Sequence, residues 1–91
     1  MGRMGKRKAD PARCFGHRLR QLRHAARLSQ EQLATKAGLD RTYVSSCERG
    51  ERNVSLSTIC KLAEALGVSP HELLTGLAEH GEQEGRAGPR R

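Results

Sequence analysis

Signals that start and stop helices recur at short intervals along the middle of this chain, and they leave room only for short helices. Serine and aspartate cap free backbone N–H groups at a helix start, and glycine ends helices because it adopts the left-handed conformation without a steric penalty. The start signals are Asp10, Ser29, Asp40, Ser55 and Ser69, and the stop signals are Gly38, Gly50, Gly67 and Gly76. Ser29 and Gln32 have the spacing of a capping box. Ser69 and Glu72 repeat that spacing, with Pro70 at the first helical position.

Between these signals the apolar residues fall at helical spacing, and no segment alternates as a strand does. The five predicted helices run from Pro11 to Arg27, from Gln30 to Ala37, from Arg41 to about Arg49, from Ser55 to Leu66, and from Pro70 onward. Their apolar faces are Phe15, Leu19, Leu22 and Ala26; Leu33, Ala34 and Ala37; Val44 and Cys47; Leu56, Ile59, Cys60, Ala63 and Leu66; and Leu73, Leu74 and Leu77. Helices this short are unstable alone, so these faces must pack together. The sequence therefore predicts a compact all-α domain of five helices.

The chain carries an excess of positive charge, much of it near the N-terminus. The formal net charge is +7, from 17 Lys and Arg against 10 Asp and Glu. We expect a basic flexible arm over residues 1–12, one folded domain over 13–77 and a disordered tail over 78–91. A basic chain attracts polyanions, nucleic acid before anionic membrane, although a basic surface without such a partner is the alternative. The arm could follow DNA phosphates, or it could be a solvated tail.

Other classes of function find little support. The three cysteines, Cys14, Cys47 and Cys60, are an odd number without zinc-ligand spacing, so we expect free thiols in a reducing compartment. A metal site near Cys14 and His17 would lack a second ligand pair, and neither a metal nor a cofactor is expected. The sequence has no catalytic Ser/His/Asp set, no paired carboxylates and no phosphate-binding glycine loop, so we expect no enzyme. It has no signal peptide and no apolar stretch of membrane-spanning length, which predicts a cytoplasmic protein without membrane attachment.

The segment from Gln30 to Arg49 carries the strongest indication of function. It predicts a helix, a sharp turn at Gly38 and a second helix within 20 residues. Ala34 is small enough for the two helices to cross closely, and Val44 and Cys47 would anchor the second helix from below. The outer side of that helix keeps polar and basic side chains, namely Arg41, Thr42, Ser45, Ser46 and Arg49. A rigidly held helix of this kind is what the major groove of DNA admits.

The chain resembles the phage-repressor (Cro-like) helix-turn-helix family, whose lambda-repressor-like domain is a bundle of five helices. The resemblance covers about Phe15 to Leu77 and rests on the segment LSQEQLATKAGLDRTYVSSCERGERNVSLSTICKLAEALGVSPHELL. Within it, the segment DRTYVSSCERGERNVSLSTICKLAEALGV is similar to the controller proteins of restriction-modification systems. The resemblance implies a transcriptional regulator, such as a repressor, that binds double-stranded DNA sequence-specifically as a homodimer on a near-palindromic operator.

The resemblance also assigns roles to individual residues. Those expected at base edges are Arg41, Thr42, Ser45 and Ser46. Arg41 suits a bidentate contact with guanine, and Thr42 suits a thymine methyl group. Those expected at the sugar-phosphate backbone are Gln30, Tyr43, Arg49, Arg52 and Asn53. Alternatives stay open, since Arg41 could reach phosphate instead and Tyr43 could pack against the first helix.

Three further features follow from the resemblance. Arg23 and Glu48 are expected to form an ion pair that fixes the orientation of the third helix, with two unrelated surface charges as the alternative. The expected dimer interface consists of Val68, Leu73, Leu74 and Leu77, part of which could instead belong to the core of one chain. Cys47 is smaller than the aliphatic residue usual at its position, which predicts looser packing and an inert thiol.

One alternative function uses the same fold. An antitoxin-like or adaptor module would bind another protein and would bind DNA only secondarily. The basic side chains on the third helix and in the loop after it favour a DNA-binding regulator, and a controller acting on its own promoter region is the specific expectation.

Overall fold

Five helices make up the described part of the computed structural model, which covers residues 10–75 and 77. They are α1 (Pro11–Ala25), α2 (Gln30–Ala37), α3 (Arg41–Glu48), α4 (Leu56–Leu66) and α5 (Pro70–Leu73). No strand occurs within this part of the chain, and the predicted all-α fold is confirmed. α1 begins at Pro11, inside the predicted arm, because Asp10 caps its first turn. The rest of the arm and the predicted tail over 78–91 lie outside the described residues.

The helix starts follow the predicted signals with one exception. The Ser29 hydroxyl accepts from the Gln32 N–H at 3.0 Å, while the Gln32 side chain accepts from the Ser29 N–H at 2.8 Å. The hydroxyls of Ser55 and Ser69 accept in the same way at the starts of α4 and α5. Asp40 precedes α3 as expected, but its carboxylate makes no capping hydrogen bond and instead accepts from the Thr42 hydroxyl at 3.3 Å. The first turn of α3 therefore keeps free N–H groups at its positive end.

Four helix ends share one backbone motif. A residue with positive φ follows each of α1 to α4, and the next N–H donates to the carbonyl five residues earlier at 2.8–3.1 Å. After α2, α3 and α4 that residue is a glycine, whereas after α1 it is Arg27, with φ of 59°. α1 ends at Ala25, two residues before the predicted end at Arg27. The end was misplaced because no glycine marks it in the sequence.

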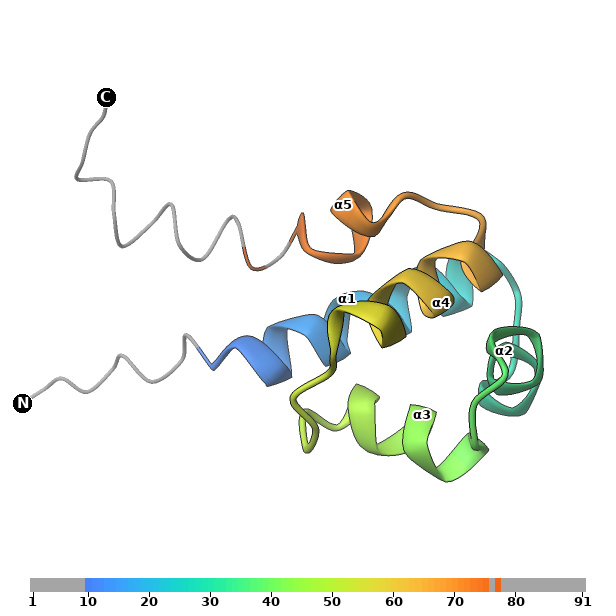
Figure 1. Ribbon diagram of the computed structural model, residues 1–91, viewed down its shortest axis with the longest axis horizontal. Helices are drawn as coiled ribbons and strands as arrows, with labels where there is room; N and C mark the ends of the chain where they lie inside the picture. Colours follow the sequence, from blue (N-terminus) through green and yellow to red (C-terminus); the bar gives the residue numbers. More distant parts are fainter. Residues whose placement is uncertain (1–9, 76, 78–91) are drawn as a thin grey trace, which may run out of the picture.

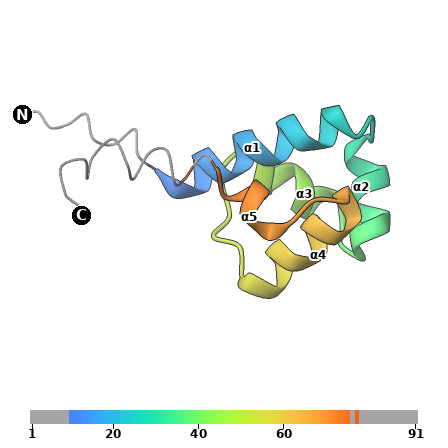
Figure 2. The same ribbon diagram turned by 90° about the horizontal axis from the view of Figure 1, so that it is seen from above.

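The helices pack into one core. α1 contacts α3 and α5, α2 contacts α3 and α4, and α4 contacts α5 (Figures 1 and 2). The largest fully buried side chains are Leu19, Leu33, Leu62, Leu73, Val44 and Cys47. Figure 2 shows α5 over the space between α1 and α4, where Leu73 reaches the core. No helix of the described residues is long and apolar enough to cross a membrane.

The predicted apolar face of α4 is wrong at two positions. Leu56 is 79% exposed and Cys60 is also exposed, whereas Leu62, which was not assigned to the face, is completely buried. α4 has apolar residues on more of its circumference than it buries, so spacing alone does not locate the buried side.

Candidate nucleic-acid interface

α3 lies at the edge of the molecule, with α1 and α2 packed on its inner side (Figure 1). Val44 and Cys47 point into the core with exposures of 0% and 1%. Arg41, Thr42 and Arg49 are exposed on the other side. The turn at Gly38, whose φ of 72° is in the left-handed region, joins α2 to this helix. The arrangement is a helix-turn-helix unit whose second helix offers a polar surface to solvent.

A close approach of backbones holds the C-terminal half of α3 against α1. A Cβ atom added to Gly16 would lie 2.3 Å from the carbonyl oxygen of Cys47 and 2.7 Å from that of Glu48. A Cβ atom added to Gly50 would lie 2.6 Å from the Cγ of Arg13. Sequence analysis did not assign a role to Gly16. A glycine inside a helical pattern was the available signal, because it often marks such an approach.

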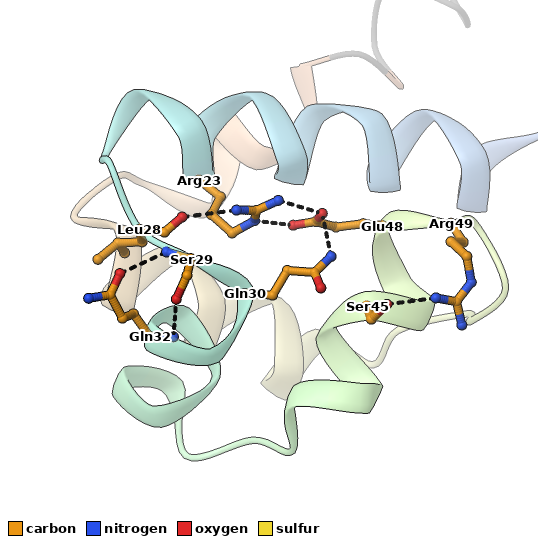
Figure 3. A network of polar contacts seen from close by, with 8 residues as sticks. All are labelled: Arg23, Leu28, Ser29, Gln30, Gln32, Ser45, Glu48 and Arg49. Atoms are coloured by element: carbon orange, nitrogen blue, oxygen red, sulfur yellow. Dashed lines mark hydrogen bonds and ion pairs between the residues drawn. The ribbon is translucent and has the colours of Figure 1, made fainter.

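Three helices are joined at one carboxylate, as Figure 3 shows. Arg23 of α1 donates to both oxygens of Glu48 at 2.6 and 3.0 Å, and their side chains are only 9% and 3% exposed. The remaining contacts are a hydrogen bond from Arg23 Nη1 to the Leu28 carbonyl at 2.9 Å and one from Gln30 Nε2 to Glu48 Oε1 at 3.0 Å. Gln30 is the first residue of α2 and Glu48 is the last of α3. The network thus ties the ends of α2 and α3 to α1.

The charge state of this network is fixed by its hydrogen bonds. Burial alone would raise the pKa of the Glu48 carboxyl, but the hydrogen bonds from Arg23 and Gln30 and the charge of Arg23 outweigh it. The pKa of Glu48 therefore lies below its ordinary value. At neutral pH the carboxylate is ionised and can hold both partners.

Ser46 does not lie on the outer side of α3, and that prediction is wrong. It is 6% exposed, and its hydroxyl donates to the Tyr43 carbonyl at 2.8 Å while accepting from Arg52 Nε at 3.0 Å. The Arg52 guanidinium also lies over the Tyr43 ring, 5.2 Å from its centroid. Helical rotation of about 100° per residue places Ser46 on the inner flank and leaves Ser45 further out. Ser46 and Tyr43 together hold Arg52 in the loop after α3.

Arg49 is held by two polar neighbours. Its Nη1 donates to the Ser45 hydroxyl at 2.6 Å, and its Nε and Nη2 donate to the two carboxylate oxygens of Glu51 at 2.9 and 3.1 Å. Both members of the ion pair are more than half exposed. The Arg49 hydrogen bond lowers the pKa of Glu51. Sequence analysis did not assign Glu51, although an acid two residues after an exposed arginine was a visible signal.

The remaining predicted polar residues are open to solvent. Arg41, Thr42 and Asn53 are exposed, and Arg41 makes no hydrogen bond or ion pair with another described residue. Arg41 stands in the first turn of α3, where the positive end of the helix lies. An unengaged guanidinium in this position is available to a base or a phosphate.

The residues expected at a dimer interface do not share one environment. Leu73 is completely buried in the core of one chain, so its assignment to an interface is wrong. Val68 and Leu74 are partly buried and pack against the edge of the core, and Leu77 is also partly buried. Leu74 and Leu77 also line a hollow of about 160 Å³ together with Phe15, Val54 and Ile59. A four-residue helix gave too little periodicity for this division to be predicted.

Cys47 lies on the buried side of α3, and burial raises the pKa of its thiol despite a hydrogen bond with Tyr43 and the nearby charge of Arg52. A protonated, buried thiol is unreactive. The described residues contain no group of three or more His, Cys, Asp or Glu side chains that could hold a metal ion.

This chain is similar in sequence and in fold to known helix-turn-helix proteins. Residues 15–75 match the family described as helix-turn-helix domain. The chain is 52% identical over 61 residues to control protein C.BamHI of Bacillus amyloliquefaciens, covering 66% of this chain and 75% of that protein. It is 47% identical over 74 residues to control protein C.SmaI of Serratia marcescens, covering 81% of this chain and 88% of that protein. The crystal structure of the restriction-modification controller protein C.AhdI from Aeromonas hydrophila is similar, with 60% identity, a TM-score of 0.67, and coverage of 68% of this chain and 94% of that one.

Proposed function

We propose that this chain, which belongs to the helix-turn-helix domain family, regulates transcription by binding a specific operator in double-stranded DNA. Restriction-modification control proteins are among its relatives. α3 is the proposed reading helix, meaning the helix that enters the major groove. The proposed site of action is the protein's own promoter region, as for a restriction-modification controller. One observation supports this most. The polar side chains of α3 face solvent, while its apolar side is packed in the core, which holds the helix in place.

Base contacts are proposed for Arg41, Thr42 and Ser45. Arg41 and Thr42 are exposed and Ser45 is half-buried, and Arg41 makes no hydrogen bond or ion pair with another described residue. Ser46 is left out of this set, because its hydroxyl is used inside the protein. A bidentate contact from arginine to guanine discriminates by about 1–3 kcal/mol, so Arg41 would contribute most to the choice of sequence.

Phosphate contacts are proposed for one residue of α3, one at the start of α2 and three in the segment after α3. They are Gln30, Tyr43, Arg49, Arg52 and Asn53. Arg52 is pre-positioned by Ser46 and by the Tyr43 ring, and that reduces the entropy lost when it binds. Gln30 donates to Glu48 through its side chain, so its backbone N–H at the start of α2 is the group we assign to phosphate.

A homodimer follows from the small span of one reading helix. α3 has eight residues and reaches only a few base pairs, whereas two copies related by a two-fold axis would enter major grooves about 34 Å apart. We propose that Val68, Leu74 and Leu77 contribute to this contact, because all three are apolar and only partly buried, and Leu74 and Leu77 line the hollow at α5. The operator is then near-palindromic.

Selection of bound duplexes from a random library, followed by footprinting of the winner, tests the proposal. The expected result is one enriched sequence with two inverted half-sites, protected on one face of the duplex with centres about one helical turn apart. Equal enrichment of unrelated duplexes would contradict sequence-specific regulation. A single protected half-site would contradict the dimer while leaving DNA recognition in place.

A further inference from the structure

A line of basic side chains runs along the exposed flank of α1. Arg13, His17, Arg20 and His24 follow one another at spacings of four, three and four residues, and all four are exposed. At 100° per residue they share a sector of about 60° of the helix and extend over about 17 Å of its length. We call these four residues the basic stripe. None of the four side chains makes a hydrogen bond or ion pair with another described residue.

The described part of the chain offers the basic stripe no acid to pair with. α1 is the one helix of the five described that contains neither Asp nor Glu. At the end of α3, the Glu48 carboxylate is already used by Arg23 and Gln30. In the loop that follows, Glu51 is used by Arg49. The cationic groups of the stripe are therefore left for an outside anion.

The basic stripe lies beside the contact between α1 and α3. Gly16 and Arg23 face α3, the first through its close approach to the Cys47 and Glu48 carbonyls and the second through its ion pair. Both stand within about 90° of the stripe around the axis of α1. The stripe is thus on the flank of α1 next to α3, and not on the opposite side of the molecule.

The two ends of the basic stripe meet the two segments that we assign to phosphate. Arg13 packs against the loop after α3, since a Cβ atom added to Gly50 would lie 2.6 Å from the Cγ of Arg13. His24 stands in the last turn of α1, six residues before Gln30 at the start of α2. The stripe therefore joins these two segments along the side of α3.

We propose that the basic stripe of α1 binds phosphates of the DNA backbone flanking the half-site that α3 enters, and adds affinity that does not depend on sequence. This inference rests on the proposed function and extends its contact surface to a helix that was given no role in binding. Arg13 and Arg20 supply permanent charges, and His17 and His24 supply further N–H donors.

The chemistry of the basic stripe fits DNA better than other anionic partners. It contains no aromatic or aliphatic side chain, whereas the centre of a protein interface is usually apolar. A helix that binds a membrane surface keeps an apolar face for the lipid, but the apolar face of α1 is buried in the core through Phe15 and Leu19.

The experiment measures dissociation constants of the full chain between 50 and 200 mM salt, on the operator selected from the random library and on an unrelated duplex. Each phosphate contact contributes about 0.9 to the slope of log Kd against log salt. Because a homodimer carries two stripes, Arg13→Gln and Arg20→Gln are each expected to make the slope shallower by about two units on both duplexes. The preference for the operator should stay at the wild-type value. Glutamine keeps the Cβ and Cγ atoms with which Arg13 packs against Gly50.

Lys61→Gln is the matched control, because it removes the same charge from an exposed position on α4. It should keep the wild-type slope. Arg20→Lys should restore the slope that Arg20→Gln loses, since an ammonium group also neutralises phosphate. Neutral methylphosphonates placed one at a time along the operator locate the contact. Those flanking the half-site should weaken the wild type but not the variant that combines Arg13→Gln with Arg20→Gln.

A wild-type slope in both single variants, or equal sensitivity of the wild type and the double variant to every methylphosphonate, would overturn the assignment of the stripe and leave the proposed function standing. A wild type that prefers no duplex would overturn the proposed function. The slopes on the unrelated duplex would then still decide whether the stripe binds phosphate.

Discussion

Because Gly16 has no side chain, α1 and α3 can approach each other closely at this residue. The carbonyl oxygens of Cys47 and Glu48 occupy the space that a Cβ atom would need. Both are backbone atoms, so the clash cannot be relieved by turning a side chain. The contact fixes the C-terminal end of α3 against α1.

Gly16→Ala therefore opposes two effects of known sign. Alanine in a helix interior is worth about 1 kcal/mol more than glycine, whereas overpacking against backbone costs about 1–3 kcal/mol and here falls at the upper end. We expect urea unfolding to show a net loss of 1 kcal/mol or more. A gain in stability, as helix propensity alone dictates, would show that the two helices do not approach this closely.

Protonation of Glu48 at acidic pH should lower the free energy of unfolding. Its carboxylate pairs with Arg23 in a nearly buried position, and its pKa is lowered in the folded state. Because the pKa of Glu48 is lower in the folded than in the unfolded chain, its ionised form stabilises the fold at every pH above the ordinary pKa of about 4.5. This stabilisation is lost as the pH falls below that value and through the pKa of the folded state. Glu48→Gln leaves Arg23 buried without its counter-charge, and should cost about 3 kcal/mol at neutral pH.

Denaturant unfolding of both proteins across the acid range checks this. The difference in unfolding free energy between wild type and Glu48→Gln should shrink as the pH falls below the ordinary value, because only the wild type loses the pair. Glu64→Gln, which removes an exposed carboxylate of α4, is the control, and its unfolding free energy at neutral pH should match that of the wild type. A difference that stays constant down to about pH 3 would mean that the pair does not titrate with folding.

The ends of the helices obey one rule with one exception. Glycine follows α2, α3 and α4 at the left-handed position, but Arg27 occupies it after α1 with φ of 59°. A non-glycine residue in this conformation costs roughly 1 kcal/mol. Arg27 is exposed, and its side chain makes no hydrogen bond or ion pair with another described residue that would be lost on replacement.

Arg27→Gly should accordingly raise the unfolding free energy by about 0.5–1 kcal/mol, less what glycine gains in the unfolded chain. Thermal unfolding measures the shift. Gly67→Ala is the matched control, since a Cβ there meets no atom within 4 Å and introduces backbone strain alone. It should lower stability by about 1 kcal/mol, and equal effects of the two changes in the same direction would contradict the account of these ends.

Local chemistry made the helices predictable, and contacts between helices made the rest unpredictable. Capping serines and stop glycines act within a few residues, so the bounds of α2 and α4 could be read from the sequence. The burial of Ser46 depends on which flank of α3 faces the loop at Arg52, and the role of Gly16 depends on where α3 crosses α1. Helical spacing carries no information on either. The same limit explains why the buried side of α4 was misplaced.

The molecule as a whole is built to hold one short helix at its edge. α1 and α2 both pack on α3, and α4 and α5 complete the core on the side away from α3 (Figure 1). The shared carboxylate of Glu48 and the approach at Gly16 fix the orientation of α3 relative to α1. Such rigid mounting would reduce the entropy lost if side chains of α3 bind the proposed operator.

Nuclear magnetic resonance of the isotope-labelled protein, titrated with the selected operator, tests the central claim most directly. The largest amide shifts are expected over residues 40–46 and at the start of α2, with smaller ones in the loop over 49–53. The exposed side of α4 around Lys61 and Glu64 should stay unchanged. Shifts concentrated on α4, with residues 40–46 unaffected, would show that α3 is not the surface that meets DNA.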